Sequence, residues 1–209
     1  MRDPISDKMQ EGVEEGAFPG GVLLVWYQSQ IIHHAAYGHA CLIPHPEPAS
    51  CDTVYDLASL TKPLAAVNAA VLLAADGRIV LDHLLERYVP ELEKKALGRA
   101  TLRQLLNHAT GLPAWRPFYE RIAPDGKRLR EKPLEERRSA LCAAIHDEPL
   151  IEPVGARAIY SDLGFILLGE ILERVSRKDW AALCHEEVFP RLGLKGLFYM
   201  SETGPTGEV

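Results

Sequence analysis

The chain has 209 residues, of which 47% are hydrophobic and 25% are charged, and its formal net charge is −6. This is an ordinary globular composition, sufficient for one large domain or two small ones, and it argues against disorder. The acidic balance and the lack of a long lysine or arginine run exclude an electrostatic footprint for nucleic acid or for an anionic membrane surface, so the expected partner is a small molecule.

The first element is predicted to be a short amphipathic helix. Ile5, Met9 and Val13 recur every four residues, and the segment ends before FPGG, which breaks a helix. The acidic N-terminus lacks the basic and then apolar pattern of a secretory signal, and no run of eighteen apolar residues indicates a membrane span. We therefore expect a cytoplasmic protein that does not bind a membrane.

Two strand-like runs come next. GVLLVWYQ and IIHHAAYGHA flank the dipeptide SQ, which predicts a β-hairpin whose first strand is too apolar to keep one face in water. Two strands alone do not make a stable sheet, so the hairpin is expected to belong to a larger sheet or to bind a partner.

Metal and cofactor sites are not expected. Alternation along a strand places neighbouring histidines on opposite faces, and no carboxylate pattern accompanies the histidine cluster, which consists of His33, His34, His39 and His45. The cysteines form no C-x-x-C pair, which indicates reduced thiols, with a bridge between Cys41 and Cys51 as the alternative; the other two are Cys142 and Cys184.

The stretch DLASLTKP, residues 56–63, carries the first chemical signal. It precedes an apolar segment that predicts a buried helix from Leu60 to Ala75. Ser59 and Lys62 lie three residues apart, on one face of a helix, so the amine can reach the hydroxyl. The helix dipole and burial are expected to lower the pKa of Lys62 and make it a base for Ser59, and the Ser59 amide can supply half an oxyanion hole.

Helical patterns continue after ADGR, residues 75–78. They are LDHLLERYVPEL, then TLRQLLNHATGLP with Thr101 as N-cap, and then LEERRSALCAAIHDEPL, LGFILLGEILERVSRK and WAALCHEEVFPRLGL. The polar stretch 117–136 is interpreted as a solvated connection. His108 is expected to tie down a helix end rather than act as a base, and an aromatic group, Trp115, Phe118 and Tyr119, either lines an acyl pocket or simply packs.

With these flanks, the chain resembles the serine beta-lactamase and penicillin-binding-protein superfamily, in which S-x-x-K opens a buried helix. The segment from Val54 to Leu92 looks like the class C-like branch, and TLRQLLNHATGLP is similar to its LLxHxSGL element, with Thr110 where serine is usual. The resemblance implies an α/β or α+β fold with an antiparallel sheet flanked by helices and an all-helical insertion. It divides the chain into residues 1–80 with the active-site helix, a mainly helical insertion at 81–154, and the tyrosine-motif loop with later helices at 155–209.

The branch's second motif, Y-x-N, corresponds to Tyr160, Ser161 and Asp162. The resemblance implies that Tyr160 is a proton-transfer group beside Lys62. Asp162 departs from the asparagine, because an ionised aspartate only accepts hydrogen bonds, and it favours a protonated lysine. An alternative alignment matches Ser161, Asp162 and Leu163 to the S-D-N motif of class A enzymes, with leucine in place of the asparagine. The helix that follows agrees better with the alignment of Tyr160 to the Y-x-N motif.

The expected function is that of a serine hydrolase that forms an acyl-enzyme at Ser59 and acts on a small ester, a beta-lactam or a D-amino-acid peptide. The family's third motif, K-T-G or H-x-G, does not occur, so the chain resembles a truncated member that lacks the sheet-completing strands. We expect it to be a poor catalyst alone and to self-associate or bind a complementary C-terminal fragment. The alternative is a degenerate relative that serves as a non-catalytic binding or assembly module.

Overall fold

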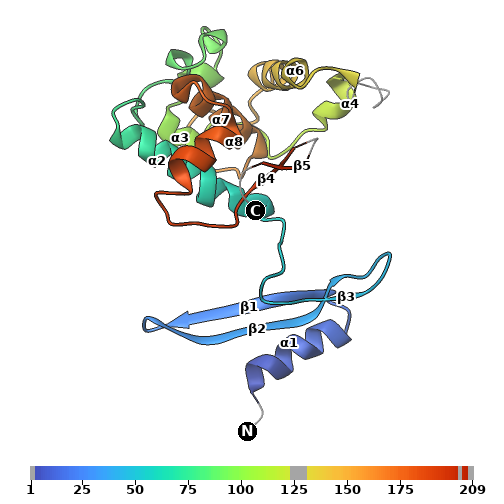
Figure 1. Ribbon diagram of the computed structural model, residues 1–209. Coiled ribbons are helices and arrows are strands. Elements are labelled where there is room, and N and C mark those ends of the chain that lie inside the picture. The colour runs from blue at the N-terminus through green and yellow to red at the C-terminus, as the bar shows by residue number, and fades with distance from the viewer. Residues whose placement is uncertain (1–2, 123–130, 202–203, 207–209) are drawn as a thin grey trace. The chain divides into compact units, whose positions relative to one another are not determined.

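The computed structural model describes residues 3–122, 131–201 and 204–206 of the chain (Figure 1). The chain divides into two compact units, Met1–Leu57 and Ala58–Val209, and each unit is described by itself. The segment that carries Ser59 clusters with the second unit, which is mainly helical, and not with the N-terminal hairpin. The three-segment division of the sequence stays a prediction.

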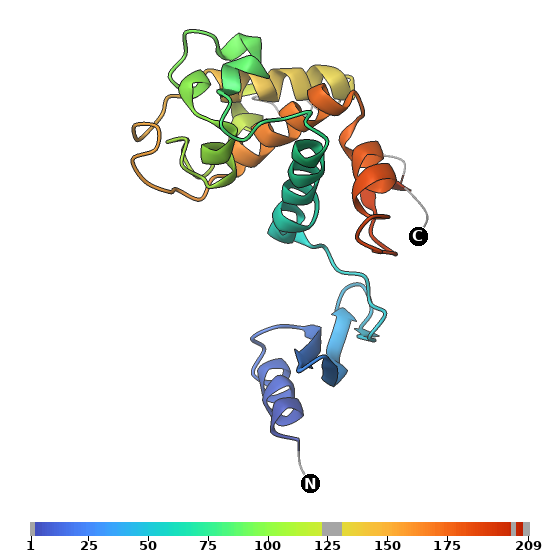
Figure 2. The same ribbon diagram turned by 90° about the vertical axis from the view of Figure 1, so that its left-hand side faces the viewer.

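The first unit is a helix packed on an antiparallel sheet. Helix α1 (Pro4–Glu14) precedes strands β1 (Gly20–Tyr27), β2 (Gln30–Cys41) and the short β3 (Glu47–Pro48), which pair in the order β1-β2-β3 (Figures 1 and 2). The predicted helix and hairpin are thus confirmed. The two hairpin turn residues, Gln28 and Ser29, have positive φ angles of 45° and 63°, as turns that match strand twist require.

Helix α1 is fastened to β2 by a chain of hydrogen bonds. The Tyr37 hydroxyl lies 2.8 Å from Nε2 of His33 and 2.8 Å from the Ser6 hydroxyl, and Nδ1 of His33 lies 3.3 Å from Asp3. Within this unit, part of the hairpin surface is not covered, since Leu24 is 48% exposed and Trp26 is 62% exposed. The first unit by itself therefore does not bury all of the apolar surface that the sequence predicts for β1.

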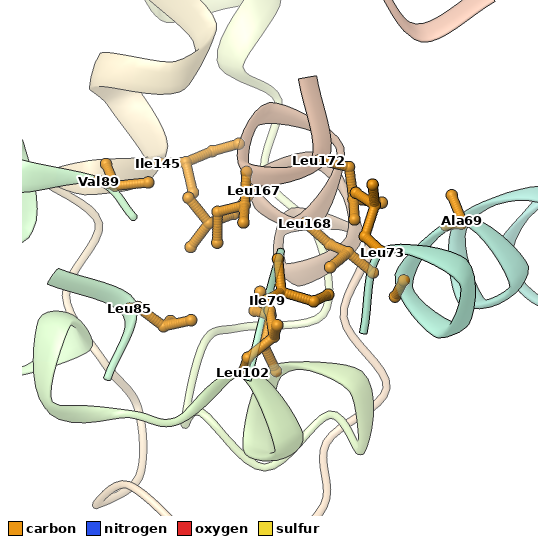
Figure 3. Close-up of a cluster of buried hydrophobic side chains, with 14 of the residues drawn as sticks. Ala69, Leu73, Ile79, Leu85, Val89, Leu102, Ile145, Leu167, Leu168 and Leu172 are labelled. Atoms are coloured by element: carbon orange, nitrogen blue, oxygen red, sulfur yellow. The ribbon is translucent and has the colours of Figure 1, made fainter. Parts of the chain in front are cut away.

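The second unit surrounds a core of leucine side chains. Helix α7 (Asp162–Ser176) packs against α2 (Asn68–Ala75), α3 (Leu102–Leu106) and α6 (Leu134–His146). Of two shorter helices, α8 (Trp180–Leu183) packs against α7 and α4 (Phe118–Ile122) packs against α6. Figure 3 shows Leu167, Leu168 and Leu172 of α7 directed toward the other elements. Each is at most 1% exposed, and burying such a side chain stabilises a fold by about 1.5–3 kcal/mol.

One predicted helix in this unit is wrong. LDHLLERYVPEL forms two short 3₁₀ turns, η3 (Leu85–Arg87) and η4 (Pro90–Leu92), instead of a continuous helix. Pro90 has no N–H to continue a helix, and the N–H of Leu85 bonds to the carbonyl of Ala100 at 2.8 Å. The predicted helices over 134–150 and 163–178 are confirmed as α6 and α7, and 101–113 contains the shorter helix α3. The segment 180–194 contains α8, the π-helical turn η6 (Cys184–Val188) and irregular residues.

The unit also contains another 3₁₀ turn, η5 (Leu97–Arg99), and a C-terminal hairpin of β4 (Tyr199–Ser201) and β5 (Gly204–Thr206). All four cysteines are free of disulfides. One described segment, Ala58–Ala75, has the length and mean hydropathy of a membrane-spanning helix. A single such segment is weak evidence, because the core helix of a soluble protein passes the same test.

Candidate functional site

Ser59 lies in an irregular start to the segment that continues as α2. A 3₁₀ turn, η1 (Ala58–Leu60), is followed by a π-helical stretch, η2 (Lys62–Val67), and only then by the α-helix. The sequence predicts a helix from Leu60 and contains no signal for the π-helical stretch. The side-chain amide of Asn68 donates to the carbonyls of Pro63 and Leu64 at 2.8 and 3.1 Å, which satisfies acceptors that a normal helical turn would use.

The residue before Ser59 has an unusual backbone conformation. Ala58 has a φ of 44°, in the left-handed region that a side chain disfavours. Such conformations persist only where the surrounding structure holds them, and they concentrate at functional sites together with π-helical turns. Both features therefore flank Ser59 within a few residues.

Lys62 brings the predicted residues together. Its amine donates to the Ser59 hydroxyl at 3.1 Å and to Oδ1 of Asp162 at 2.7 Å, and it lies 4.9 Å from the ring centroid of Tyr160. The Lys62 side chain is 15% exposed and Ser59 is exposed. The four residues singled out by the sequence thus form one cluster, although their catalytic roles remain predictions.

The Lys62 pKa follows the expectation from Asp162 and not the one from the helix dipole and burial. Burial lowers the pKa of Lys62, as the sequence predicts, but hydrogen bonds and charge from Asp162 and Tyr160 raise it by more, so the pKa lies above its ordinary value. The amine is therefore protonated at neutral pH. Asp162, 100 residues away in sequence, has the effect on Lys62 that its departure from asparagine predicts, and this effect outweighs burial.

Tyr160 has the opposite shift. Its pKa is lowered from the ordinary value, first by the hydrogen bond with Ser59 and then by the hydrogen bond and charge of Lys62. The side chain is 55% exposed, so the phenol is open to solvent and to a bound molecule. A tyrosine with a lowered pKa beside a serine hydroxyl can exchange a proton with it.

The loop that carries Tyr160 is fixed at the start of α7. Ser161 caps this helix: its hydroxyl accepts from the N–H of Gly164 at 3.2 Å and donates to the carbonyl of Pro113 at 2.7 Å. The N–H of Asp162 donates to the carbonyl of Ala114 at 2.9 Å. The TGLP turn therefore holds the tyrosine motif in place.

Gly111 is required in that turn. Its φ is 81°, and a Cβ atom there would lie 2.1 Å from the carbonyl oxygen of Glu152, so no larger residue fits without a shift of the backbone. His108, at the end of α3, contacts the tyrosine loop as well: its Nδ1 accepts from the N–H of Ser161 at 3.0 Å. The expectation that His108 ties down this end of the helix agrees with that bond.

A cavity of about 470 Å³ adjoins Lys62 and Asp162. Most of its wall is apolar, and charged side chains also line it. The lining residues are Ala58, Thr61, Lys62, Ala66, Arg138, Leu141, Cys142, Asp162, Phe165, Ile166, Gly169, Glu170, Glu173 and Trp180. The site thus has room beside it for a small organic group.

The aromatic residues named from the sequence do not line that cavity. Phe118 is buried in the core, whereas Trp115 and Tyr119 are exposed, with ring centroids 6.4 Å apart. Phe165, which no sequence motif singles out, does line the cavity, and its ring centroid lies 5.8 Å from the Lys62 amine. Its position three residues after Asp162 on one helix face was the available signal.

Comparisons with known proteins agree with this geometry. A family model described as Beta-lactamase matches residues 5–203. A protein named a D-alanyl-D-alanine carboxypeptidase, from Salmonella agona (strain SL483), is 30% identical over 199 residues, which cover 90% of this chain and 44% of that protein. The chain thus spans less than half the length of this curated relative.

Solved structures match the fold. A class C beta lactamase from Rhodobacter sphaeroides is 27% identical with a TM-score of 0.73, and the match covers 91% of this chain and 49% of that one. EstCE1, a hydrolase with promiscuous acyltransferase activity, is 25% identical with a TM-score of 0.75, and the match covers 96% and 54%. The predicted beta-lactamase/transpeptidase-like α+β fold is confirmed. The chain belongs to the beta-lactamase family of serine hydrolases.

Proposed function

We propose that this chain carries the acylation centre of a serine hydrolase, in which Ser59 attacks the carbonyl carbon of a small ester or amide. The observation that carries this proposal is the contact of one amine, that of Lys62, with Ser59, Asp162 and the Tyr160 ring. A serine hydroxyl needs a base to become a nucleophile. The raised pKa of Lys62 and the lowered pKa of Tyr160 support the tyrosine as the base.

In the acylation step, ionised Tyr160 accepts the proton of Ser59 while Oγ forms a bond to the carbonyl carbon. The Lys62 ammonium stabilises the phenolate before this step and donates to Oγ. When the tetrahedral intermediate collapses, the bond to the leaving group breaks and Tyr160 returns the proton to the leaving oxygen or nitrogen. Water then attacks the acyl-enzyme, loses its proton to Tyr160, and Ser59 recovers a proton from the phenol.

Asp162 favours an ester over a beta-lactam or peptide as the substrate. An asparagine at this position donates a hydrogen bond to a substrate carbonyl, whereas a carboxylate only accepts. Its charge also repels an anionic substrate near the site. EstCE1 is described as a hydrolase with acyltransferase activity, and the Salmonella relative is named a carboxypeptidase. We give the ester first place because of Asp162 and keep the lactam and the D-amino-acid peptide as competing substrates.

The experiment is a burst assay with p-nitrophenyl acetate. The proposal predicts a slow release of about one p-nitrophenol per chain from the 209-residue protein, no burst from Ser59→Ala, and a strongly slowed burst from Tyr160→Phe. A burst of unchanged size in Ser59→Ala would contradict it. Turnover after the burst should be low, since loss of one oxyanion donor from a protease costs about 10²–10³-fold and this sequence has no third motif.

The competing function is a non-catalytic binding or assembly module in the cytoplasm. One observation favours it, namely that the ion pair with Asp162 holds Lys62 in its protonated form. The exposed face of the hairpin, with Leu24 and Trp26, fits association with a second copy or with a complementary fragment. A folded, self-associated chain that shows no burst at any pH would favour this function.

A further inference from the structure

We propose that His108 is the positioning residue of Tyr160: as a neutral imidazole it holds the loop on both sides of the tyrosine and sets the location of the phenol beside Ser59. This proposal rests on the proposed function for the role of Tyr160, and it adds a residue that does not touch the reacting atoms.

Three contacts join His108 to the tyrosine loop. The carbonyl of His108 accepts from the N–H of Ile159 at 2.8 Å, and its Nδ1 accepts from the N–H of Ser161 at 3.0 Å. Between these two bonds, the imidazole packs against the Tyr160 ring, with centroids 4.6 Å apart and planes tilted by 38°. One residue therefore contacts the amino acid before the tyrosine, the tyrosine itself and the amino acid after it.

His108 is itself held in a restricted conformation. Its φ is 57°, in the left-handed region, and its N–H donates to the carbonyl of Leu105 at 3.1 Å at the end of α3. The imidazole also packs against Phe165 of α7, with centroids 4.9 Å apart. Because the ring contacts both Tyr160 and Phe165, the position of its Nδ1 is restrained by the helix end and by α7 together.

The hydrogen bond requires an unprotonated Nδ1. Burial lowers the pKa of His108, and the nearby Lys62 charge lowers it further against the opposing effect of Asp162. Lys62 and Asp162 are the charged side chains that shift the pKa of the imidazole, and they also shift the pKa of the Tyr160 phenol. His108 therefore stays neutral at pH 7, with its remaining proton on Nε2, and Nδ1 keeps its lone pair for Ser161.

Protonation of His108 in acid removes this acceptor, because both ring nitrogens then carry protons. The Ser161 N–H loses its partner, and a second positive charge appears beside Lys62. The tyrosine loop should then lose its fixed position. The proposal therefore predicts that the reactivity of Ser59 falls in acid at a pH below the ordinary imidazole pKa.

The experiment compares His108→Ala, His108→Asn and His108→Phe in the full 209-residue chain. Asparagine keeps an acceptor near the position of Nδ1 and tolerates a left-handed φ. Phenylalanine keeps the ring contact and loses the acceptor. His83→Ala is the matched control, because His83 also contacts a tyrosine, Tyr88, with Nδ1 3.3 Å from its hydroxyl, and it does not contact the candidate site.

Two readouts are measured for each variant, with folding checked by thermal unfolding. The first is the pH titration of the Tyr160 phenol carbon by NMR of tyrosine-labelled protein, assigned with Tyr160→Phe. The second is the rate of fluorophosphonate labelling of Ser59 across pH. We expect His108→Ala and His108→Phe to raise the Tyr160 pKa and to slow labelling at neutral pH by up to about a hundredfold, the order of loss that a misplacement near 1 Å produces. In His108→Asn, the Tyr160 pKa and the labelling rate of Ser59 should both lie close to those of the unmodified chain.

An unchanged Tyr160 titration in folded His108→Ala would overturn the proposal, as would an asparagine variant no better than alanine. A similar effect from His83→Ala would also overturn it, because the change would then reflect general destabilisation. If unmodified Ser59 does not react at all, the proposed function fails instead. The Tyr160 titration still decides the role of His108 in that case.

Discussion

The amine of Lys62 and the carboxylate of Asp162 form an ion pair with an Nζ to Oδ1 distance of 2.7 Å. The aspartate stands where the class C-like branch has an asparagine, and it starts the helix that follows Tyr160. The pair makes Lys62 a fixed cation, and the proton that must leave Ser59 then has Tyr160 as its acceptor. The following predictions test the roles of these side chains.

Replacing Asp162 with asparagine should change the substrate preference of the site between a beta-lactam and an ester. Burial still acts on Lys62 in Asp162→Asn, while the ion pair that raises its pKa is lost, so the Lys62 pKa should fall. The new amide can donate to a substrate carbonyl. We expect acylation by a chromogenic cephalosporin to rise relative to acylation by p-nitrophenyl acetate. The control is Asp82→Asn, which removes the exposed ion pair with Arg103. If the unmodified protein reacted faster with the cephalosporin than with the ester, the role given to Asp162 would be wrong.

Replacing Tyr160 with phenylalanine should remove the base. Positioned general bases contribute about 10²–10⁴-fold, so Tyr160→Phe should slow acylation of Ser59 by this order. Tyr119→Phe is a matched control, because Tyr119 and Tyr160 are each 55% exposed and Tyr119 lies outside the cluster around Lys62. Thermal unfolding should change little in both variants. Equal acylation rates in the two variants would remove Tyr160 from the mechanism.

Glu91 should contribute to a pH-dependent part of the stability. Hydrogen bonds from Arg174 lower its pKa from 4.5 to about 2. Since the folded-state pKa is depressed, the contribution is present above pH 4.5 and is lost as pH falls toward about 2. The effect should be modest, because the Glu91 side chain is 51% exposed. In urea unfolding, Glu91→Gln should be less stable than the unmodified chain at neutral pH, and the difference should shrink in this acid range.

Glu93 supplies the control for that experiment. It is an exposed carboxylate at the end of the same 3₁₀ turn, η4, and no ion pair involves it among the residues that the structure describes. Glu93→Gln should leave the urea midpoint almost unchanged at both ends of the range. A difference between Glu91→Gln and the unmodified chain that stayed constant from neutral to acid pH would show that the Arg174 pair is not its source.

Trp26 should drive self-association of the chain. It is 62% exposed on the uncovered face of the hairpin, where apolar side chains and unpaired strand edges favour contact with a second copy. We expect the purified chain to elute as a dimer or larger species, and Trp26→Lys to shift it toward monomer. Trp115→Lys, at a 54% exposed tryptophan of the other unit, is the control. A monomeric unmodified chain in sizing and light-scattering measurements would refute this prediction.

Local patterns in the sequence were sufficient for much of the fold. The apolar runs of β1 and β2 and the helical periods of α6 and α7 depend on neighbours in the chain, and the sequence predicts these elements. The 3₁₀ turns at Leu85 and Pro90 are not predicted, because the bond from Leu85 to Ala100 is a tertiary contact that replaces helix formation. A periodic pattern alone cannot reveal such competition.

In the candidate site, too, the features that depend on neighbouring residues are predicted from local sequence patterns, and the features that depend on distant residues are not. The spacing of Ser59 and Lys62 predicts their contact, since it depends on one helical turn. The balance at Lys62 between burial and Asp162 depends on a contact across 100 positions in sequence, and the contact of His108 with the tyrosine loop depends on one across 53 positions. The π-helical start of the segment depends on where the side chain of Asn68 donates. These features require the folded chain.

The most direct test is to identify the residue that a fluorophosphonate modifies. The folded 209-residue chain is incubated with the probe, and the adduct is followed by intact mass and located by peptide mapping. The account predicts one slow adduct, located on Ser59, which is absent in Ser59→Ala and strongly slowed in Lys62→Ala and Tyr160→Phe. An adduct on another residue, or labelling that persists unchanged in Ser59→Ala, would contradict the claim that Ser59 is the nucleophile.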